Sequence, residues 1–232
     1  MIKVVSDQAD GLRRLMAGSP GRVVAVVGGG PMVGVTSVVL NLAAALMQQG
    51  KDVLLLDERN GVPPNLGQRE ERLVIIDTVL DKDGALSLMA AQADHVLVVL
   101  QPNAASITAS YACIKRLHHA HALQRMRVLV NCATNAAEAR RIVANLAHTG
   151  SRYLALALEP AGNVRADPRL AQARRLNLAV VDAFQTSPAA MDFRQIASEL
   201  LRWPWRAPVG SLPLRVAAAP AGHEGRPALE MQ

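Results

Sequence analysis

Residues 28–37 read GGGPMVGVTS and directly follow the apolar run Arg22–Val27. A glycine-rich loop between a buried strand and a helix is typical of phosphate-binding loops, whose GxxxxGK[ST] pattern wraps backbone N–H groups around phosphates. Here the glycine spacing and Thr36 agree with that pattern, but Val35 stands where the lysine belongs. The stretch is a nucleotide site, the remnant of one, or a structural strand-to-helix turn, and the loop alone leaves the three readings open.

Short apolar runs recur along the chain on both sides of this loop. Because they are continuous rather than alternating, they are typical of strands buried on both faces. The stretches between them are rich in alanine and leucine at three- and four-residue spacing, which favours helices that cover a sheet. We expect strands at 22–27, 52–57, 72–77, 95–100, 127–131 and 153–158, and helices at 36–48, 104–118, 136–148 and 189–202. The predicted fold class is α/β, a single domain with a mostly parallel, doubly wound sheet like that of P-loop NTPases.

Amino-acid composition limits the classes of protein to which this chain can belong. The chain has 232 residues, 50% hydrophobic and 19% charged, which is enough to bury a full core. The two cysteines, Cys113 and Cys132, show neither a disulfide framework nor metal-type spacing. No stretch has the length and flanks of a signal peptide or of a membrane span. We therefore expect a cytoplasmic protein.

The formal charge of +6 leaves a nucleic-acid surface as one alternative. The arginine pairs Arg140–Arg141 and Arg174–Arg175 are the clusters that a non-specific DNA-surface binder would use. Aromatic residues make up only 3% of the chain, which argues against a stacking platform for single strands. A solvated basic surface is the favoured interpretation, so nucleic acid is not an expected partner.

The chain divides into three expected parts. Residues 1–20 contain an N-terminal helix and linker, 21–205 the α/β domain, and 206–232 a tail that is rich in Pro, Ala and Gly and expected to be disordered. The apolar run 212–219 in this tail is interrupted by Pro213 and Arg215. It is too poor an amphipathic segment for stable membrane anchoring.

Ligands of a doubly wound sheet bind outside the carboxyl ends of the strands, where the glycine-rich loop, Asp57 and Asp77 are expected to converge. Thr36 and Asp77 would hold Mg²⁺ if a nucleotide binds there. The candidate phosphate-binding residues are Gly28, Gly29, Gly30, Gly34, Thr36 and Ser37, and Asp57 and Asp77 are the remnants of a catalytic site.

Several blocks in a fixed order resemble the MinD/ParA family of deviant Walker ATPases, and more specifically its FlhG/FleN branch, the regulators of flagellar number. The resemblance covers roughly residues 6–205. The family blocks are 41–46 (NLAAAL), 50–57 (GKDVLLLD) and 74–78 (VIIDT), and those of the branch are 7–13, 93–102 (ADHVLVVLQP), 106–117, 129–131, 181–187 and 196–204.

Departures from the family pattern fall in the site itself. The family loop runs GKGGVGKT, whereas this chain has Gly30 at the signature lysine, Pro31 at a glycine and Val35 at the loop lysine. The DxD motif after the second strand becomes Asp57-Glu58-Arg59, so an arginine replaces the carboxylate that positions water. Two lost lysines weaken triphosphate binding by about two to four decades. The resemblance therefore implies a degenerate ATPase site and no expected hydrolysis.

Two alternatives to that interpretation stay open. Arg59 could supply a replacement charge in a working ATPase switch that binds ATP with Mg²⁺. The resemblance also implies that Asn131 and Asp167 lie near an adenine base, although both residue types equally mark turns and helix starts. The cluster His118, His119 and His121 is interpreted as a polar helix end rather than a metal site, because no acidic or cysteine partner has matching spacing.

The N-terminal segment carries the clearest partner motif. On a helix Leu12, Leu15 and Met16 share one face with Gln8, which suits docking into a groove, although the same stripe suits packing on its own domain. The resemblance implies that this segment engages a signal-recognition-type flagellar GTPase, with Gln8 the key residue. The candidate partner-binding residues are Asp7, Gln8, Leu12, Arg13 and Leu15.

The predicted function is regulation of bacterial flagellar assembly, number or placement, by protein contact rather than ATP turnover. A flagellar transcription activator or a switch-complex protein is a further candidate partner. Relatives dimerise with ATP and attach to membrane, so a peripheral location at the inner membrane or the cell pole is the alternative for this chain. Here the signature lysine is absent, and only residues 58–71 separate two expected strands. We therefore expect a monomer.

Overall fold

The computed structural model describes residues 22–60 and 72–205. At its centre lies β1 (Arg22–Gly28), whose Val23–Val27 are buried because the strand has a neighbouring strand on each side and helices on both faces. The sheet order is β2-β3-β1-β4-β5-β6, and every pair is parallel. The other strands are β2 (Val53–Asp57), β3 (Leu73–Asp77), β4 (His95–Leu100), β5 (Arg125–Ala133) and β6 (Ala157–Arg165). The predicted single α/β domain is confirmed.

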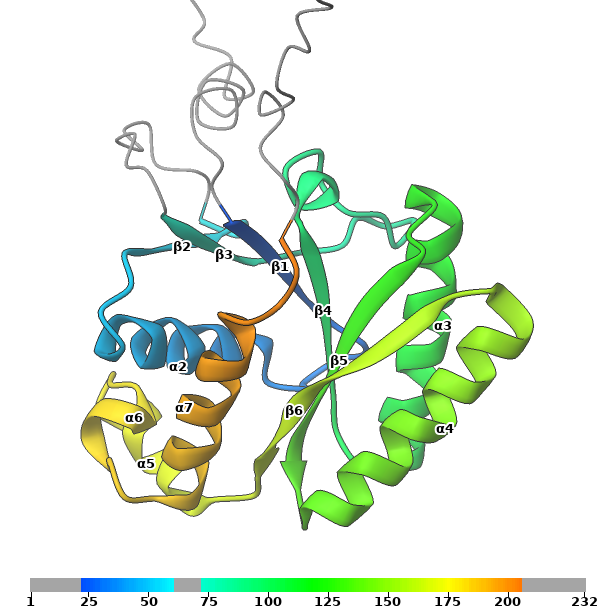
Figure 1. Cartoon of the computed structure of the whole chain (residues 1–232). Helices are drawn as coiled ribbons and strands as arrows, with labels where there is room; N and C mark the ends of the chain where they lie inside the picture. The colour runs from blue at the N-terminus through cyan, green and yellow to red at the C-terminus, as the bar shows by residue number, and fades with distance from the viewer. Residues whose placement is uncertain (1–21, 61–71, 206–232) are drawn as a thin grey trace, which may run out of the picture.

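Helices cover both faces of the sheet (Figure 1). Successive residues of β1 point to opposite faces, as a strand requires, so Val24 and Val26 pack in one core and Val23, Ala25 and Val27 in the other. The first core lies under α2 (Val35–Gln48), α5 (Pro168–Arg175), α6 (Val180–Ala183) and α7 (Pro188–Leu200). The second lies under α3 (Ala104–His121), α4 (Ala136–Leu154) and the short 3-10 turn η1 (Ala90–Gln92).

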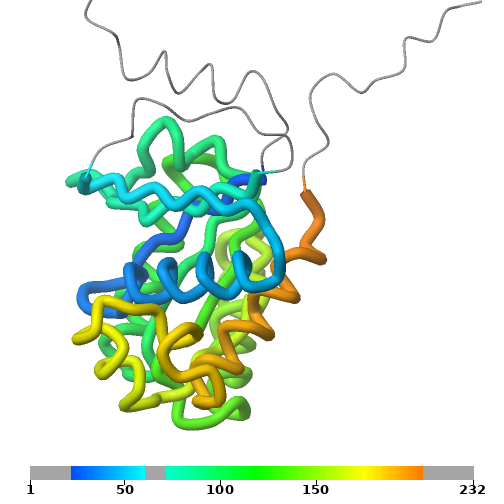
Figure 2. Tube along the Cα trace, turned by 90° about the vertical axis from the view of Figure 1, so that its left-hand side faces the viewer, coloured from blue at the N-terminus to red at the C-terminus, as the bar shows by residue number. Residues whose placement is uncertain are grey.

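The order of the strands fixes where a ligand site can form. From β1 the chain moves to β2 and β3 on one side, and from β3 it crosses to β4 on the other. The carboxyl ends of β1, β3 and β4 therefore surround a topological switch point, where doubly wound folds bind ligands. Figure 2 looks onto α2, with β2 beside it in cyan and α5 to α7 below it in yellow and orange.

The last strand is the main correction to the predicted elements. The strand expected at 153–158 is wrong, because α4 continues through Leu154 and ends at Ala155, which has a left-handed φ of 49°. The strand proper is β6, which contains Pro160 and pairs only with β5. An edge strand tolerates proline, which removes a ladder donor. The short helices α5 and α6 were not among the predicted elements, although Asp167 caps α5 as a helix-start signal should.

The expected N-terminal helix of residues 1–20 and the expected disordered tail of 206–232 lie outside the described residues. Within the part of the chain that the structure describes, no helix is both long and apolar enough to span a bilayer.

Candidate functional site

The glycine-rich loop joins β1 to α2 and lies against α3. The backbone N–H of Gly29 donates to the carbonyl of Val99 at 2.8 Å. A Cβ added at Gly29 would lie 2.1 Å from the hydroxyl oxygen of Ser110, so only glycine allows α3 to approach this closely. At this position, the structure explains the glycine by helix packing.

The other end of the loop forms the N-terminus of α2. Gly34 is its N-cap, with φ of 87°, and no side chain caps the helix. The first N–H groups of an α-helix have no partner within the helix, and the helix dipole favours an anion there. The loop therefore keeps the backbone part of a phosphate site, while Val35 supplies no charge.

Asn131, at the end of β5, holds this loop in place. Its Nδ2 donates to the carbonyl of Val33 at 2.9 Å, and its Oδ1 accepts from the N–H of Cys132 at 3.0 Å. A Cβ on Gly34 would lie 2.6 Å from Nδ2 of Asn131. Asn131 thus clamps the loop in this structure, and its amide is occupied by that role.

Three side chains meet at the carboxyl ends of β2 and β3. The Thr36 hydroxyl donates to Oδ2 of Asp77 at 2.6 Å. The Nη1 group of Arg59 lies 3.0 Å from the same Oδ2 and 3.1 Å from the Thr36 hydroxyl oxygen. Asp77 is only 2% exposed, whereas the Arg59 side chain is half exposed. A guanidinium therefore bridges the loop hydroxyl and a buried carboxylate.

The residues around Arg59 fix its backbone. Oδ1 of Asp57 accepts from the N–H of Arg59 at 3.0 Å, and Oδ2 accepts from the Asn60 amide at 2.8 Å. Glu58 accepts from the N–H of Val79 at 2.9 Å and from the hydroxyl of Ser87. The register pairs Asp57 with Asp77. The Asp57-Glu58-Arg59 stretch therefore forms a turn that directs the arginine at Asp77.

This geometry tests whether magnesium fits. In P-loop NTPases the ion is held by the loop Ser/Thr and by a strand-end Asp, which here are Thr36 and Asp77. The Nη1 of Arg59 is within hydrogen-bond distance of both oxygens, so a positive group already contacts the pair. The residues present fit a guanidinium and do not fit a magnesium ion beside it.

A cleft of about 990 Å³ opens beside the loop, between α2, β2 and the α5–α6 segment. Five of the predicted phosphate-binding residues line it, together with Arg59 and Arg174: Gly28, Gly30, Gly34, Thr36 and Ser37. Most of the remaining lining is aliphatic: Leu40, Met47, Val53, Leu55, Leu170 and Leu178. The sequence analysis missed these residues. The sequence of α2 contained a signal for them, because this helix is apolar on nearly every side. Such a helix is usually covered on more than one side.

The remaining predicted positions lie elsewhere. Asp167 does not line the cleft: it accepts from the N–H of Arg169 at 2.8 Å and from that of Ala189 at 3.1 Å, and so joins the starts of α5 and α7. The histidine cluster occupies the last turn of α3, where the Nε2 of His121 accepts from the N–H of Leu86. In residues 22–60 and 72–205, no group of three or more His, Cys, Asp or Glu could hold a metal. The partner-binding residues Asp7, Gln8, Leu12, Arg13 and Leu15 lie outside the described residues.

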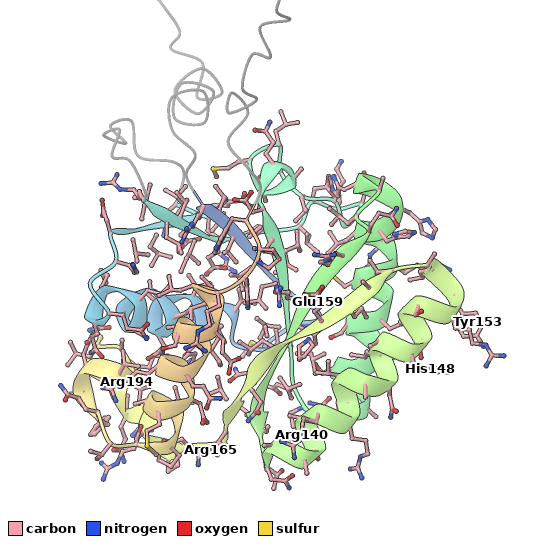
Figure 3. The ribbon with its side chains drawn as sticks, viewed as in Figure 1. Arg140, His148, Tyr153, Glu159, Arg165 and Arg194 are labelled. Atoms are coloured by element: carbon pink, nitrogen blue, oxygen red, sulfur yellow. The ribbon has the colours of Figure 1, made fainter. Side chains whose placement is uncertain are left out.

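A second polar cluster lies at the opposite end of the sheet, where the strands begin. His95 is buried against Trp203 and Trp205, with ring centroids 5.1 and 5.0 Å away. Arg127 lies over the Trp203 ring at 4.1 Å and pairs with Glu159 at 2.7 Å; Figure 3 labels Glu159 on β6. Burial lowers the pKa of His95, and the Arg127 charge lowers it further.

Comparison with known proteins supports the predicted resemblance. No family model matches the chain. The chain is 27% identical to the antiactivator FleN of Pseudomonas aeruginosa, over 80% of this chain and 88% of that protein. The predicted resemblance to the FlhG/FleN branch is confirmed.

Solved structures support the fold. MinD from Aquifex aeolicus superposes with a TM-score of 0.59 at 18% identity, over 81% of this chain and all of that one. MinD from Pyrococcus horikoshii, solved with Mg-ADP, gives 0.56 at 14% identity, over 78% and 96%. The Cyanothece McdA–ATP complex gives 0.54 at 11% identity, over 82% and 100%. At these identities the likeness concerns the fold, which is that of MinD/ParA-type P-loop NTPases.

Proposed function

We propose that this chain, which resembles the MinD/ParA family and its FlhG/FleN branch, regulates bacterial flagellar assembly through contact with other proteins. The similarity to FleN, which spans most of both chains, supports a regulator of this kind. The relative is an antiactivator by name, so an activator protein is one candidate partner. The N-terminal motif adds a second, the signal-recognition-type flagellar GTPase that the resemblance implies.

The observation that carries the contact mechanism is the bridge from Arg59 to Thr36 and Asp77. ATP hydrolysis on this fold needs a metal at that position and a group that orients water. Here the arginine has replaced the water-positioning carboxylate of the family and also contacts the metal ligands. Val35 removes the loop cation as well. Without a metal site and a loop cation, the domain would not turn over ATP. It would then regulate through the surface that it presents to other proteins.

The surface beside the loop supports binding to a protein. Leu40, Met47 and Leu178 are each about half exposed, at 48, 54 and 52%, and all three line the cleft. Exposed apolar side chains that gather in one groove are characteristic of protein-interaction surfaces. The two arginine pairs do not form one basic surface that would favour DNA binding. Arg140 and Arg141 lie on α4 and Arg174 and Arg175 on α5, which cover opposite faces of the sheet (Figure 3 labels Arg140).

Nucleotide binding is a second proposal, kept separate from hydrolysis. Fold neighbours were solved with Mg-ADP and with ATP. In this chain the N-terminus of α2 opens into the cleft, where Arg174 adds a positive charge. We propose that any nucleotide held here binds weakly and without magnesium.

The test of the proposed function uses the N-terminal motif. The full chain should retain a flagellar GTPase of the signal-recognition type in a pull-down and accelerate its GTP hydrolysis. Leu12→Ala should weaken retention about 30-fold or more, because truncating a buried leucine costs about 2–5 kcal/mol. Gln8→Ala should impair stimulation more than retention, since the polar end of the helix would act at the chemistry.

Leu88→Ala is the matched control, because Leu88 is a 77% exposed leucine far along the chain from this motif. It should behave as the native chain does. A native chain that neither retains nor stimulates the GTPase would contradict the proposed partner.

A further inference from the structure

We infer that Arg59 is a built-in cation that takes the place of a divalent metal at this loop, and that removing its guanidinium opens a metal site at Thr36 and Asp77. The inference rests on where the charge lies. One guanidinium nitrogen reaches both oxygens that hold the ion in magnesium-dependent relatives of this fold. This inference concerns the loop site alone and does not depend on which partner the domain binds.

The buried carboxylate makes a cation necessary here. Asp77 is 2% exposed, and its Oδ1 has no hydrogen-bond partner in the described part of the chain. A buried carboxylate is costly unless a positive group or hydrogen bonds compensate it. In the native chain Oδ2 receives the Thr36 hydroxyl and Arg59, so Arg59 supplies the positive charge. Without it, Asp77 would retain one hydrogen bond and no counter-charge from these residues.

The oxygen atoms left behind suit a hard divalent cation. Oδ1 of Asp77 has no hydrogen-bond partner in the described part of the chain, and the Thr36 hydroxyl lies 2.6 Å from Oδ2. Asp57 is paired with Asp77 in the strand register, and its Oδ1 lies 3.6 Å from Nη1 of Arg59. Carboxylate and hydroxyl oxygens with open water positions are the ligands that Mg²⁺ and Mn²⁺ prefer. The set therefore suits a metal once the guanidinium is gone.

The native chain resists exchange because Arg59 is tethered at the correct place. Asp57 accepts from the backbone N–H of Arg59, and Glu58, the residue before it, accepts from the N–H of Val79. Little conformational entropy is therefore lost when the guanidinium contacts Asp77. A metal ion from solution must compete with this intramolecular cation, whose effective concentration is high. The native site should therefore not respond to magnesium.

Thermal unfolding in Mg²⁺ or Mn²⁺ tests this inference, with Mn²⁺ electron paramagnetic resonance to count bound ions. The native chain should bind no Mn²⁺ and show no shift in Tm. Arg59→Ala should unfold at a lower temperature than the native chain without metal. It should then bind one Mn²⁺ and regain roughly 5 °C at saturation. Adding Asp77→Asn to this variant should abolish both the bound ion and the gain.

Two further variants keep the test decisive. Arg174→Ala removes an arginine from the same cleft but leaves the bridge intact, so it should bind no ion. Arg59→Gln retains hydrogen-bond donors without the charge and should gain an ion even if Arg59→Ala does not fold. A native chain that binds Mn²⁺ as tightly as either Arg59 variant, or Arg59 variants that bind none, would overturn the inference.

Discussion

Val35 and Arg59 change the distribution of charge in the loop site relative to the family pattern. Val35 removes the cation that would lie against the phosphates, and Arg59 brings a cation to the side where the metal would lie. The two changes therefore have opposite signs, and Arg59 contacts Thr36, the residue that follows Val35. A phosphate chain gains most from the first position, because hydrogen bonds to charged groups are the stronger ones. Arg59 thus compensates the charge of the buried Asp77 carboxylate, and we expect the site to bind a polyphosphate weakly.

Restoring the loop lysine tests whether the loop still has phosphate-binding geometry. Val35→Lys should strengthen ATP binding about 10- to 100-fold over the native chain, because one charged hydrogen bond contributes about 1.5–3 kcal/mol. Isothermal titration calorimetry measures this change. Leu40→Lys adds the same charge farther along α2 and should give a much smaller gain. If Val35→Lys binds no better than the control, the loop is a structural turn.

His95 predicts how stability depends on pH. Its pKa is lowered in the folded state, so between that value and the ordinary value of 6.5 the unfolded chain holds a proton that the folded chain does not. The stabilisation is complete above pH 6.5 and is lost as the pH falls below it. In urea unfolding, His95→Phe should reduce the slope of stability against pH just below pH 6.5.

His148 provides the comparison for that experiment. It lies exposed on α4 (Figure 3). His148→Gln should keep the slope of the native chain. An unchanged slope in His95→Phe would show that the lowered pKa of His95 does not control stability in this range.

The contact between the loop and α3 couples the candidate site to the helix layer. Gly29 faces Ser110, which is fully buried and whose hydroxyl donates to the carbonyl of Ser106 at 2.7 Å. Neither side has room to yield, because a Cβ on Gly29 would also lie 3.0 Å from Cα of Ser110. The position of the loop therefore depends on α3 as much as on β1.

Gly29→Ala should destabilise the domain by about 1–3 kcal/mol, the usual cost of overpacking a core. The free energy of urea unfolding measures it. Combining Gly29→Ala with Ser110→Gly removes the nearest atoms and should recover part of the loss. A destabilisation that the second change does not relieve would assign the cost to the loop backbone and not to this contact.

Elements with a strong apolar signal could be predicted from the sequence, and those without one could not. β4 was predicted with its observed bounds, because His95–Leu100 is a continuous apolar run. β6 was misplaced, since Pro160 and Gly162 are poor strand residues, and Tyr153 and Leu154, where the strand was expected to begin, complete α4. The loop and the two aspartates were correctly placed at one end of the sheet, because parallel strands bring their carboxyl ends together.

The contacts of the site required the tertiary structure. A replacement charge from Arg59 was one open alternative, and its contacts with Thr36 and Asp77 could not be read from its sequence position. The contact of the Asn131 amide with the loop was not anticipated either, and a place for Asn131 near a base stays a prediction. The cleft brings together side chains from α2, β2 and the α5–α6 segment, which are distant in the sequence. Such a surface is set by packing between elements.

The candidate site and the first and last described residues lie at opposite ends of the sheet. Arg22, which begins β1, lies 5.3 Å from the ring of Trp205, the last described residue. Both lie by His95, where the strands begin, while the loop lies where they end. The first and last described residues therefore lie at the end of the sheet away from the loop.

Oligomeric state should not respond to ATP. The signature lysine of the family is Gly30 here, and a Cβ at that position would already lie 3.1 Å from Ala109. With the cross-dimer cation absent, light scattering should give the monomer mass of 24.7 kDa with and without ATP. A doubling of mass on addition of ATP would show that other contacts have replaced the missing ones.

We propose that this chain does not perform magnesium-dependent ATP hydrolysis, although it has the fold of MinD/ParA-type NTPases. Steady-state phosphate release by the full chain, with saturating ATP and Mg²⁺, tests it most directly. We predict release no faster than that of Asp77→Ala, because Arg59 contacts the metal ligands and no loop lysine is present. Steady turnover by the native chain that Asp77→Ala abolishes would contradict the account.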